Sequence, residues 1–157
     1  MGLSNDRLQR IVLADDQRVF RAGVARALRA DAGLDVVGEA TSIMDVLSIV
    51  RSAGPDVVLL GTQARSDSGL GNLTRLRECF PEVKVIVCPA SDDLEHIEAA
   101  FRFGAVGCVL STTDPAEIAT AVRRVIEATE YRAHSAPTIK QVAVARALLE
   151  LKVSKSN

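Results

Sequence analysis

Short apolar runs alternate along the chain with longer stretches in which apolar residues recur every three or four positions. Runs of the first kind are typical of strands buried on both faces, and stripes of the second kind are typical of helices with one buried side. The apolar runs predict strands at residues 11–14, 35–40, 56–60, 83–88 and 106–110. The stripes predict helices at residues 19–28, 43–50, 73–80, 94–101 and 115–126.

Residues with special backbone preferences mark the ends of these elements. Ser42 and Asp114 precede apolar stripes and are expected to cap the helices there with their side-chain oxygens. Gly33 and Gly54 follow stripes and are expected to end helices. The stretch 61–71 is rich in Gly, Ser and Thr and predicts a loop.

Five strands alternating with five helices predict an α/β fold with a parallel sheet and helices on both of its faces. Right-handed crossovers make this a doubly wound three-layer sandwich. After a break at residues 134–137, a last helix is predicted at 139–153. We therefore divide the chain into a domain at 9–130 and a linker with an extra C-terminal helix at 131–157. In folds of this class, functional residues gather at the carboxyl ends of the strands.

The composition is ordinary for a globular protein, with 48% hydrophobic and 25% charged residues. No apolar run approaches the roughly 20 residues of a membrane span, and residues 1–10 are too polar for a secretory signal. We therefore expect a cytoplasmic protein without a membrane partner. Cys79, Cys88 and Cys108 lie in apolar settings and are expected to be buried and reduced.

Charge is unevenly distributed along the chain. Residues 1–130 hold 14 Lys/Arg and 19 Asp/Glu, a net of −5, whereas residues 131–157 hold 5 Lys/Arg and 1 Asp/Glu, a net of +4. A basic segment can contact nucleic acid. A solvated helix is the simpler interpretation, because the segment has no dense block of Lys and Arg.

Four segments carry a resemblance to a known family: "IVLADDQ" at 11–17, "PDVVLL" at 55–60, "VIVCPASDD" at 85–93 and "GAVGCVL" at 104–110. Their order and spacing resemble the CheY-like receiver domains of two-component response regulators. The resemblance covers about residues 9–130 and implies a flavodoxin/CheY-like fold. It is strongest to receivers joined to a helix-turn-helix output domain of the NarL, FixJ or LuxR type. The residues after 130 are too few for a complete DNA-binding module.

The resemblance implies five positions for phosphoryl transfer from a histidine kinase. An acidic pair that holds magnesium is present as Asp15 and Asp16. The phosphoacceptor aspartate corresponds to Gly61, the switch hydroxyl to Pro89 and the lysine to Ser111. Each replacement removes a chemical capacity, because glycine has no carboxylate, proline has no hydroxyl and serine has no positive charge.

These replacements predict an atypical receiver, or pseudo-receiver, that is not an enzyme and signals without phosphorylation, with a role in transcription regulation as one option. Asp67 lies six residues beyond Gly61 in the predicted loop and is not expected to substitute for the acceptor. The family's aromatic switch residue in the fifth strand is replaced by Cys108, and a proline common in the loop after the acceptor is replaced by Arg65.

Two interpretations of the acidic pair remain open. Asp15 and Asp16 are weak candidates for a residual Mg²⁺ site, since one carboxylate of that site is lost. The alternative, which we favour, is that Asp16 caps the first helix and that Arg18 or Arg65 supplies the missing positive charge. On that interpretation the protein needs no cofactor.

In the family, the face formed by the fourth helix, fifth strand and fifth helix mediates dimerisation or partner binding. That face corresponds to residues 94–131, and we expect Cys108, Ile118 and Val122 to belong to it. The C-terminal helix is apolar nearly all round and needs burial on more than one side. Its apolar residues include Val142, Leu148 and Leu149. We expect a homodimer or another protein partner at one of these two surfaces.

Two further classes of function stay open. A small-molecule or metal sensor could use the space that Gly61 and Ser111 leave beside Asp15 and Asp16. An enzyme is less favoured, because no nucleophile with a base is evident and no Gly-rich phosphate loop follows the first strand. His96 and His134, on a helix and in the linker, are expected to be solvated.

Overall fold

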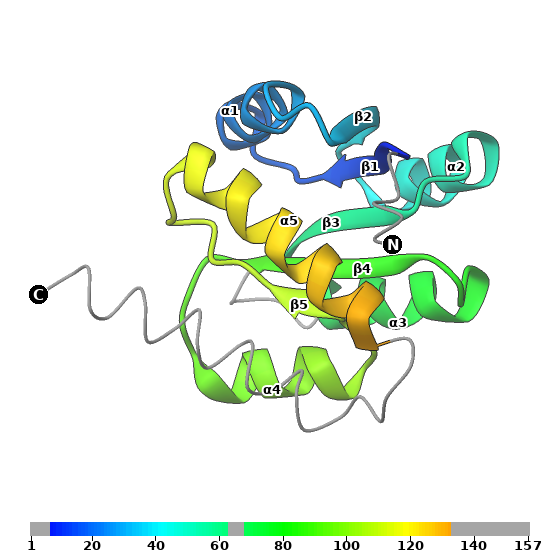
Figure 1. Ribbon diagram of the computed structural model, residues 1–157. Coiled ribbons are helices and arrows are strands. Elements are labelled where there is room, and N and C mark those ends of the chain that lie inside the picture. Colours follow the sequence, from blue (N-terminus) through cyan, green and yellow to red (C-terminus); the bar gives the residue numbers. More distant parts are fainter. Residues whose placement is uncertain (1–6, 63–67, 133–157) are drawn as a thin grey trace, which may run out of the picture.

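The computed structural model describes residues 7–62 and 68–132, which form a single five-stranded sheet with helices on both faces (Figure 1). The strands are β1 (Gln9–Ala14), β2 (Leu34–Ala40), β3 (Val57–Thr62), β4 (Lys84–Pro89) and β5 (Gly107–Cys108). The helices are α1 (Arg18–Arg29), α2 (Ile43–Ala53), α3 (Ser68–Cys79), α4 (Leu94–Arg102) and α5 (Pro115–Arg132). All paired strands are parallel and their order is β2-β1-β3-β4-β5, which confirms the predicted doubly wound fold.

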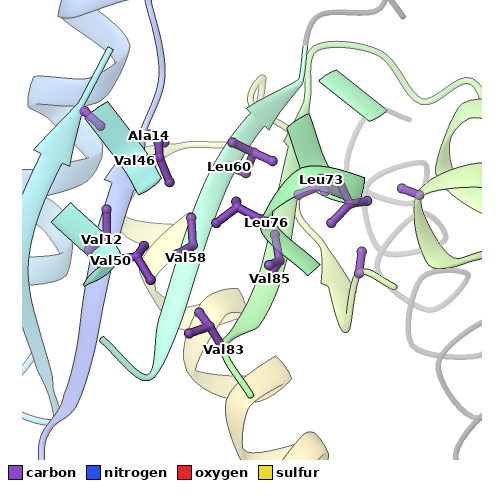
Figure 2. Packing of buried hydrophobic residues seen from close by; sticks show 14 of the residues in the cluster. Val12, Ala14, Val46, Val50, Val58, Leu60, Leu73, Leu76, Val83 and Val85 are labelled. Atoms are coloured by element: carbon purple, nitrogen blue, oxygen red, sulfur yellow. The ribbon is translucent and has the colours of Figure 1, made fainter. Parts of the chain in front are cut away.

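Two hydrophobic clusters lie on opposite faces of the sheet because side chains alternate along each strand. On β3, Val58 and Leu60 belong to the cluster shared with α2, α3 and α4, whereas Leu59 belongs to the cluster shared with α1 and α5. Figure 2 shows Val58 and Leu60 among side chains that include Val46 of α2 and Leu73 of α3. The central strands are thus buried on both sides, as their continuous apolar runs predicted.

Most of the predicted helix boundaries are confirmed by local hydrogen bonds. The Ser42 hydroxyl accepts the Asp45 N–H at 3.3 Å and caps α2, which ends at Gly54 in the left-handed conformation with φ 58°. The Asp114 carboxylate accepts the Ala116 N–H at 3.2 Å, and α5 begins at Pro115. These side chains satisfy backbone donors that the first helical turn leaves unpaired.

Three boundaries differ from the prediction. The helix expected from residue 73 already begins at Ser68, so the predicted loop 61–71 is too long. β5 spans only two residues, although Val109 and Leu110 beyond it are buried. Gly33 does not end α1, which is capped at Ala30; the Gly33 N–H instead donates to Asp31 in the turn that follows.

The cysteines divide into two groups. Cys88 and Cys108 are buried, as predicted, and burial raises the pKa of both thiols, that of Cys108 to about 12. Cys79 lies at the end of α3 and is exposed, so its predicted burial is wrong. The two buried thiols therefore stay protonated at neutral pH and act as small apolar side chains.

No helix within residues 7–62 and 68–132 is long and apolar enough to span a lipid bilayer. The predicted helix at 139–153, with Val142, Leu148 and Leu149, lies outside the described residues, as does His134.

Candidate functional site at the carboxyl edge of the sheet

The fold brings the predicted site positions to one edge of the sheet. Asp15 and Asp16 follow β1, and Gly61 lies near the end of β3, where it pairs with Cys88 of β4. Pro89 ends β4 and is buried, and its carbonyl accepts the Ser111 N–H at 2.8 Å. Because the strands are parallel, their carboxyl ends meet at one edge of the sheet. The five positions predicted from the sequence lie together at that edge.

Asp15 occupies the space above Gly61. Its Oδ1 accepts the Gln17 N–H at 2.8 Å, which fixes the carboxylate at the start of α1. A Cβ placed on Gly61 would overlap Oδ2 of Asp15 and lie 2.8 Å from its Cγ, closer than unbonded carbons approach. The Asp15 carboxylate therefore fills the volume in which any side chain at position 61 would begin.

The environment of Asp15 disfavours its charged form. Burial is the main reason that the pKa of Asp15 is raised above its usual 3.8, and the neighbouring Asp16 carboxylate adds to the effect. The Gln17 N–H and the Arg21 guanidinium act in the opposite direction but do not cancel the increase. The surroundings of Asp15 thus offset its negative charge only in part.

Among the described residues, the cation near Asp15 is Arg21 and not the predicted Arg18. Arg21 Nη1 donates to the Asp15 carbonyl at 2.7 Å, and its Nε lies 3.4 Å from Glu39 of β2. Arg21 is therefore held between β1 and β2 by backbone and side-chain oxygens.

The predicted cap of α1 by Asp16 is also wrong. The N-cap residue is Gln17, whose own side chain makes no capping hydrogen bond. Asp15 instead takes the N–H of Gln17 itself. Arg65 and Asp67 lie outside the described residues.

A small cleft of about 160 Å³ opens beside the acidic pair. Its lining residues come from β1, β3, α2, α3 and the turns that follow β1 and β2: Ala14, Asp15, Asp16, Thr41, Ser42, Ile43, Val46, Leu60, Gly61, Gly69 and Asn72. Within the described part of the chain, no three His, Cys, Asp or Glu residues cluster to hold a metal ion. The Mg²⁺ that receiver chemistry requires is thus poorly matched here, because position 61 offers no ligand and Asp15 is engaged with Gln17.

A contact that the sequence did not reveal lies next to this site. Thr62 follows Gly61, is only 2% exposed, and its Oγ1 lies 3.3 Å from Nε2 of His96 on α4. His96 is half-buried, so its predicted solvation is wrong. The contact joins the end of β3 to α4 across 34 positions of sequence, and only the polar residue at the end of an apolar strand hinted at it.

The predicted interaction residues of the domain are not on its surface. Cys108 is 4% exposed, and Ile118 and Val122 of α5 are fully buried against the sheet. The exposed residues of this region lie elsewhere, among them Leu94 at the start of α4. Any partner of this face therefore meets the outer sides of α4 and α5.

The parallel sheet of order β2-β1-β3-β4-β5, with two carboxylates directly after β1, is the doubly wound fold that receiver domains share. The sequence matches the profile of the response regulator receiver domain over residues 11–123. The chain belongs to the response regulator receiver domain family.

Curated relatives extend beyond the region that this chain shares with them. The chain is 31% identical over 121 residues to the uncharacterized transcriptional regulatory protein YxjL of Bacillus subtilis. The aligned region covers 77% of this chain and 55% of that protein. It is 30% identical over 123 residues to the oxygen regulatory protein NreC of Staphylococcus epidermidis, covering 78% and 56%. The chain thus spans about half the length of these relatives.

Solved structures support the same fold. The signal receiver domain of the response regulator NarL from Mycobacterium tuberculosis superposes with a TM-score of 0.67 at 30% identity, over 75% of this chain and 95% of that one. A LuxR-family two-component response regulator from Aurantimonas sp. SI85-9A1 gives a TM-score of 0.71 at 23% identity, over 93% and 99%. The second similarity bears on the fold alone.

Proposed function

We propose that this receiver domain works without aspartyl phosphorylation and serves two-component signalling as a protein-interaction module. The observation that carries the proposal is Gly61 near the end of β3, where the acceptor position has no carboxylate and the Asp15 carboxylate lies where its Cβ would stand. Because relatives include transcriptional regulatory proteins, control of transcription is the process that we propose for it.

The chemistry of phosphoryl transfer explains why the lack of an acceptor side chain at position 61 is decisive. The reaction needs a carboxylate nucleophile, and charge on the phosphoryl oxygens must be offset by a metal ion and by cationic or hydroxyl donors. Gly61 supplies no nucleophile, Pro89 no donor and Ser111 no positive charge. Loss of one group lowers a rate, whereas loss of the nucleophile removes the reaction.

A receiver without this chemistry keeps one resting conformation. The Thr62–His96 contact supports this, because it ties α4 to the end of β3 without involving positions 89 or 111. A domain held in one state binds its partner at all times, and only partner concentration or a change elsewhere in the assembly regulates the complex. The proposed partner is a second copy or another signalling protein, and no catalytic role is proposed.

The test is phosphorylation of the full chain by acetyl phosphate with Mg²⁺, followed by intact-mass measurement. We expect no phosphorylated species for the native chain or for Gly61→Asp alone. The triple variant Gly61→Asp, Pro89→Thr, Ser111→Lys restores the nucleophile, the hydroxyl and the cation together, and we expect it to gain a Mg²⁺-dependent phosphorylated species. The triple variant thereby shows that the assay detects a working site.

A phosphorylated species formed by the native chain would contradict the proposal. Asp67→Asn is the matched control for that outcome, since Asp67 is the nearest carboxylate after position 61 in the sequence. Loss of the species in this variant would identify Asp67 as a replacement acceptor.

The cleft beside the acidic pair favours a second candidate, a sensor of a small polar ligand. Carboxylates of Asp15 and Asp16 and the polar side chains of Thr41, Ser42 and Asn72 line it. A thermal-shift screen with divalent metals and cationic metabolites tests this function. A shift that Asn72→Ala abolishes would support it, and no shift with any compound would exclude it.

A further inference from the structure

Helix α4 presents an outer surface that combines apolar and acidic side chains. Its inner side, with Ile97 and Ala100, packs against the sheet and is buried. Leu94, Glu98 and Phe101 recur four and three residues apart and so form a stripe along the flank of the helix, beside its buried side, where Phe101 also packs against the core. Leu94 is 46% exposed and Phe101 is half-buried. We call this stripe, with the acidic residues that surround it, the α4 face.

The α4 face is strongly acidic. Segment 92–102 has four exposed carboxylates and one cation, so its net charge is −3 with His96 counted as neutral. The carboxylates are Asp92, Asp93, Glu95 and Glu98, and the cation is Arg102. An apolar stripe within such a surface favours a partner that is both apolar and basic.

The C-terminal segment of this chain has that chemistry. Residues 133–157 hold four Lys/Arg and one Glu, a net of +3. If residues 139–153 are helical, Val142, Leu149 and Val153 fall on one side and Arg146 and Lys152 flank that side. A helix with an apolar centre and positive flanks would complement the α4 face in both hydrophobicity and charge.

The segment is also long enough to reach this surface. Both α4 and α5 run antiparallel to the strands, so their carboxyl ends lie at the same edge of the sheet (Figure 1). The six residues between α5 and position 139 span up to about 20 Å when extended. Neighbouring packed helices are about 10 Å apart, so this link suffices. A helix over 139–153 is about 22 Å long and would cover α4, which is about 14 Å long.

We propose that residues 139–153 of the same chain dock on the α4 face as a sixth helix. Val142 and Leu149 pack against Leu94 and Phe101, and the tail cations lie near Glu95 and Glu98. The inference rests on the proposed function in one respect: a face that phosphorylation does not rearrange can remain covered.

Paramagnetic broadening in the full chain tests this placement. Exposed Cys79 is replaced by Ser, and Gln141→Cys supplies a single site for a nitroxide label, since the two buried thiols do not react. We expect amide signals of α4 to be strongly broadened and those of β2, at the opposite edge of the sheet, to be unaffected. Isotope-labelled chains without nitroxide, mixed with nitroxide-bearing chains without isotope, should show no broadening of α4.

Charge reversal provides the matched control. Glu98→Lys places a cation in the α4 face and should remove most of the broadening, whereas Asp35→Lys makes the same change on exposed β2 and should leave it intact. Equal broadening of α4 and β2, or none, would overturn the proposal. Broadening of α4 in the mixed sample would also overturn it, because a second copy would then cover the face. None of these outcomes depends on phosphorylation, so this proposal and the proposed function fail separately.

Discussion

The carboxyl end of β1 and the ends of β3, β4 and β5 differ in how closely their residues are built into the fold. After β1, the carboxylate of Asp15 accepts the Gln17 N–H, and the backbone carbonyl of Asp15 accepts a hydrogen bond from the Arg21 guanidinium. Arg21 also pairs with Glu39. At the other three ends, Gly61, Pro89 and Ser111 offer no charge at all. The Asp15 carboxylate thus holds the start of α1 whether or not phosphoryl transfer takes place, whereas the other three positions add no charged group to this edge.

The largest loss of stability is expected for a substitution in the interior of β3. Leu59 is fully buried between the sheet and helices α1 and α5, two residues before Gly61. We expect Leu59→Ala to lower the free energy of unfolding by about 2–5 kcal/mol, because it removes buried methyl groups and leaves a cavity. Urea unfolding followed by circular dichroism measures the change.

The matched control for that substitution is Met44→Ala on α2, where the side chain is 62% exposed. We expect a change within about 0.5 kcal/mol there, as is usual for surface positions. A similar loss for both variants would mean that β3 is less tightly packed than the structure shows.

The edge position Gly61 should show a smaller but specific effect. We expect Gly61→Ala to lower the free energy of unfolding by about 1–3 kcal/mol, because the new Cβ forces the Asp15 carboxylate to move. In an Asp15→Ala background the same substitution should cost much less. Urea unfolding of the native chain, both single variants and the double variant gives the coupling between the two positions.

Gly71→Ala is the control for the glycine substitution. A Cβ at Gly71 of α3 meets nothing within 4 Å, and alanine favours helix by about 1 kcal/mol over glycine. This variant should therefore be at least as stable as the native chain. Equal losses at both glycines would contradict the specific collision with Asp15.

The smallest expected effect concerns the ionisation of Asp15. Its pKa in the folded state is raised above the usual 3.8, chiefly by burial, so between these two pKa values the folded state binds more protons than the unfolded state. Ionised Asp15 therefore costs stability above the raised pKa. Asp15→Asn keeps an acceptor for the Gln17 N–H and removes the charge.

We expect Asp15→Asn to unfold at a higher urea concentration than the native chain at pH 7, with an advantage that vanishes as the pH falls below 3.8. Asp35→Asn, at an exposed position on β2, is the matched control for the substitution itself. A destabilised Asp15→Asn variant at pH 7 would show that the charged carboxylate is needed for the fold.

Much of the architecture follows from local sequence signals. The apolar runs place the central strands, and the caps at Ser42 and Asp114 place two helix starts because each depends on one side chain and its nearest backbone. The meeting of Asp15 with Gly61 at one edge follows from parallel strand order alone. These features need only periodicity, capping and topology.

Features that depend on tertiary packing were not predictable in the same way. Periodicity identifies the apolar side of α5, but Ile118 and Val122 on that side face the sheet and cannot also contact a partner. The choice of Arg21 over Arg18 beside Asp15 depends on where the first turn of α1 points. The contact of Thr62 with His96 joins two distant segments, and no pattern in either one specifies the other.

The two outer strands carry a further consequence, for the behaviour of the protein at high concentration. An open sheet edge can pair with the edge of another chain and so seed fibrils. β5 has only two residues, too few to serve as a template, and β2 exposes the charged side chains of Asp35 and Glu39 and breaks register against β1 between Ile11 and Val12. Shortness at one edge and charge at the other should keep the sheet from growing, so this domain should stay dispersed in concentrated solution.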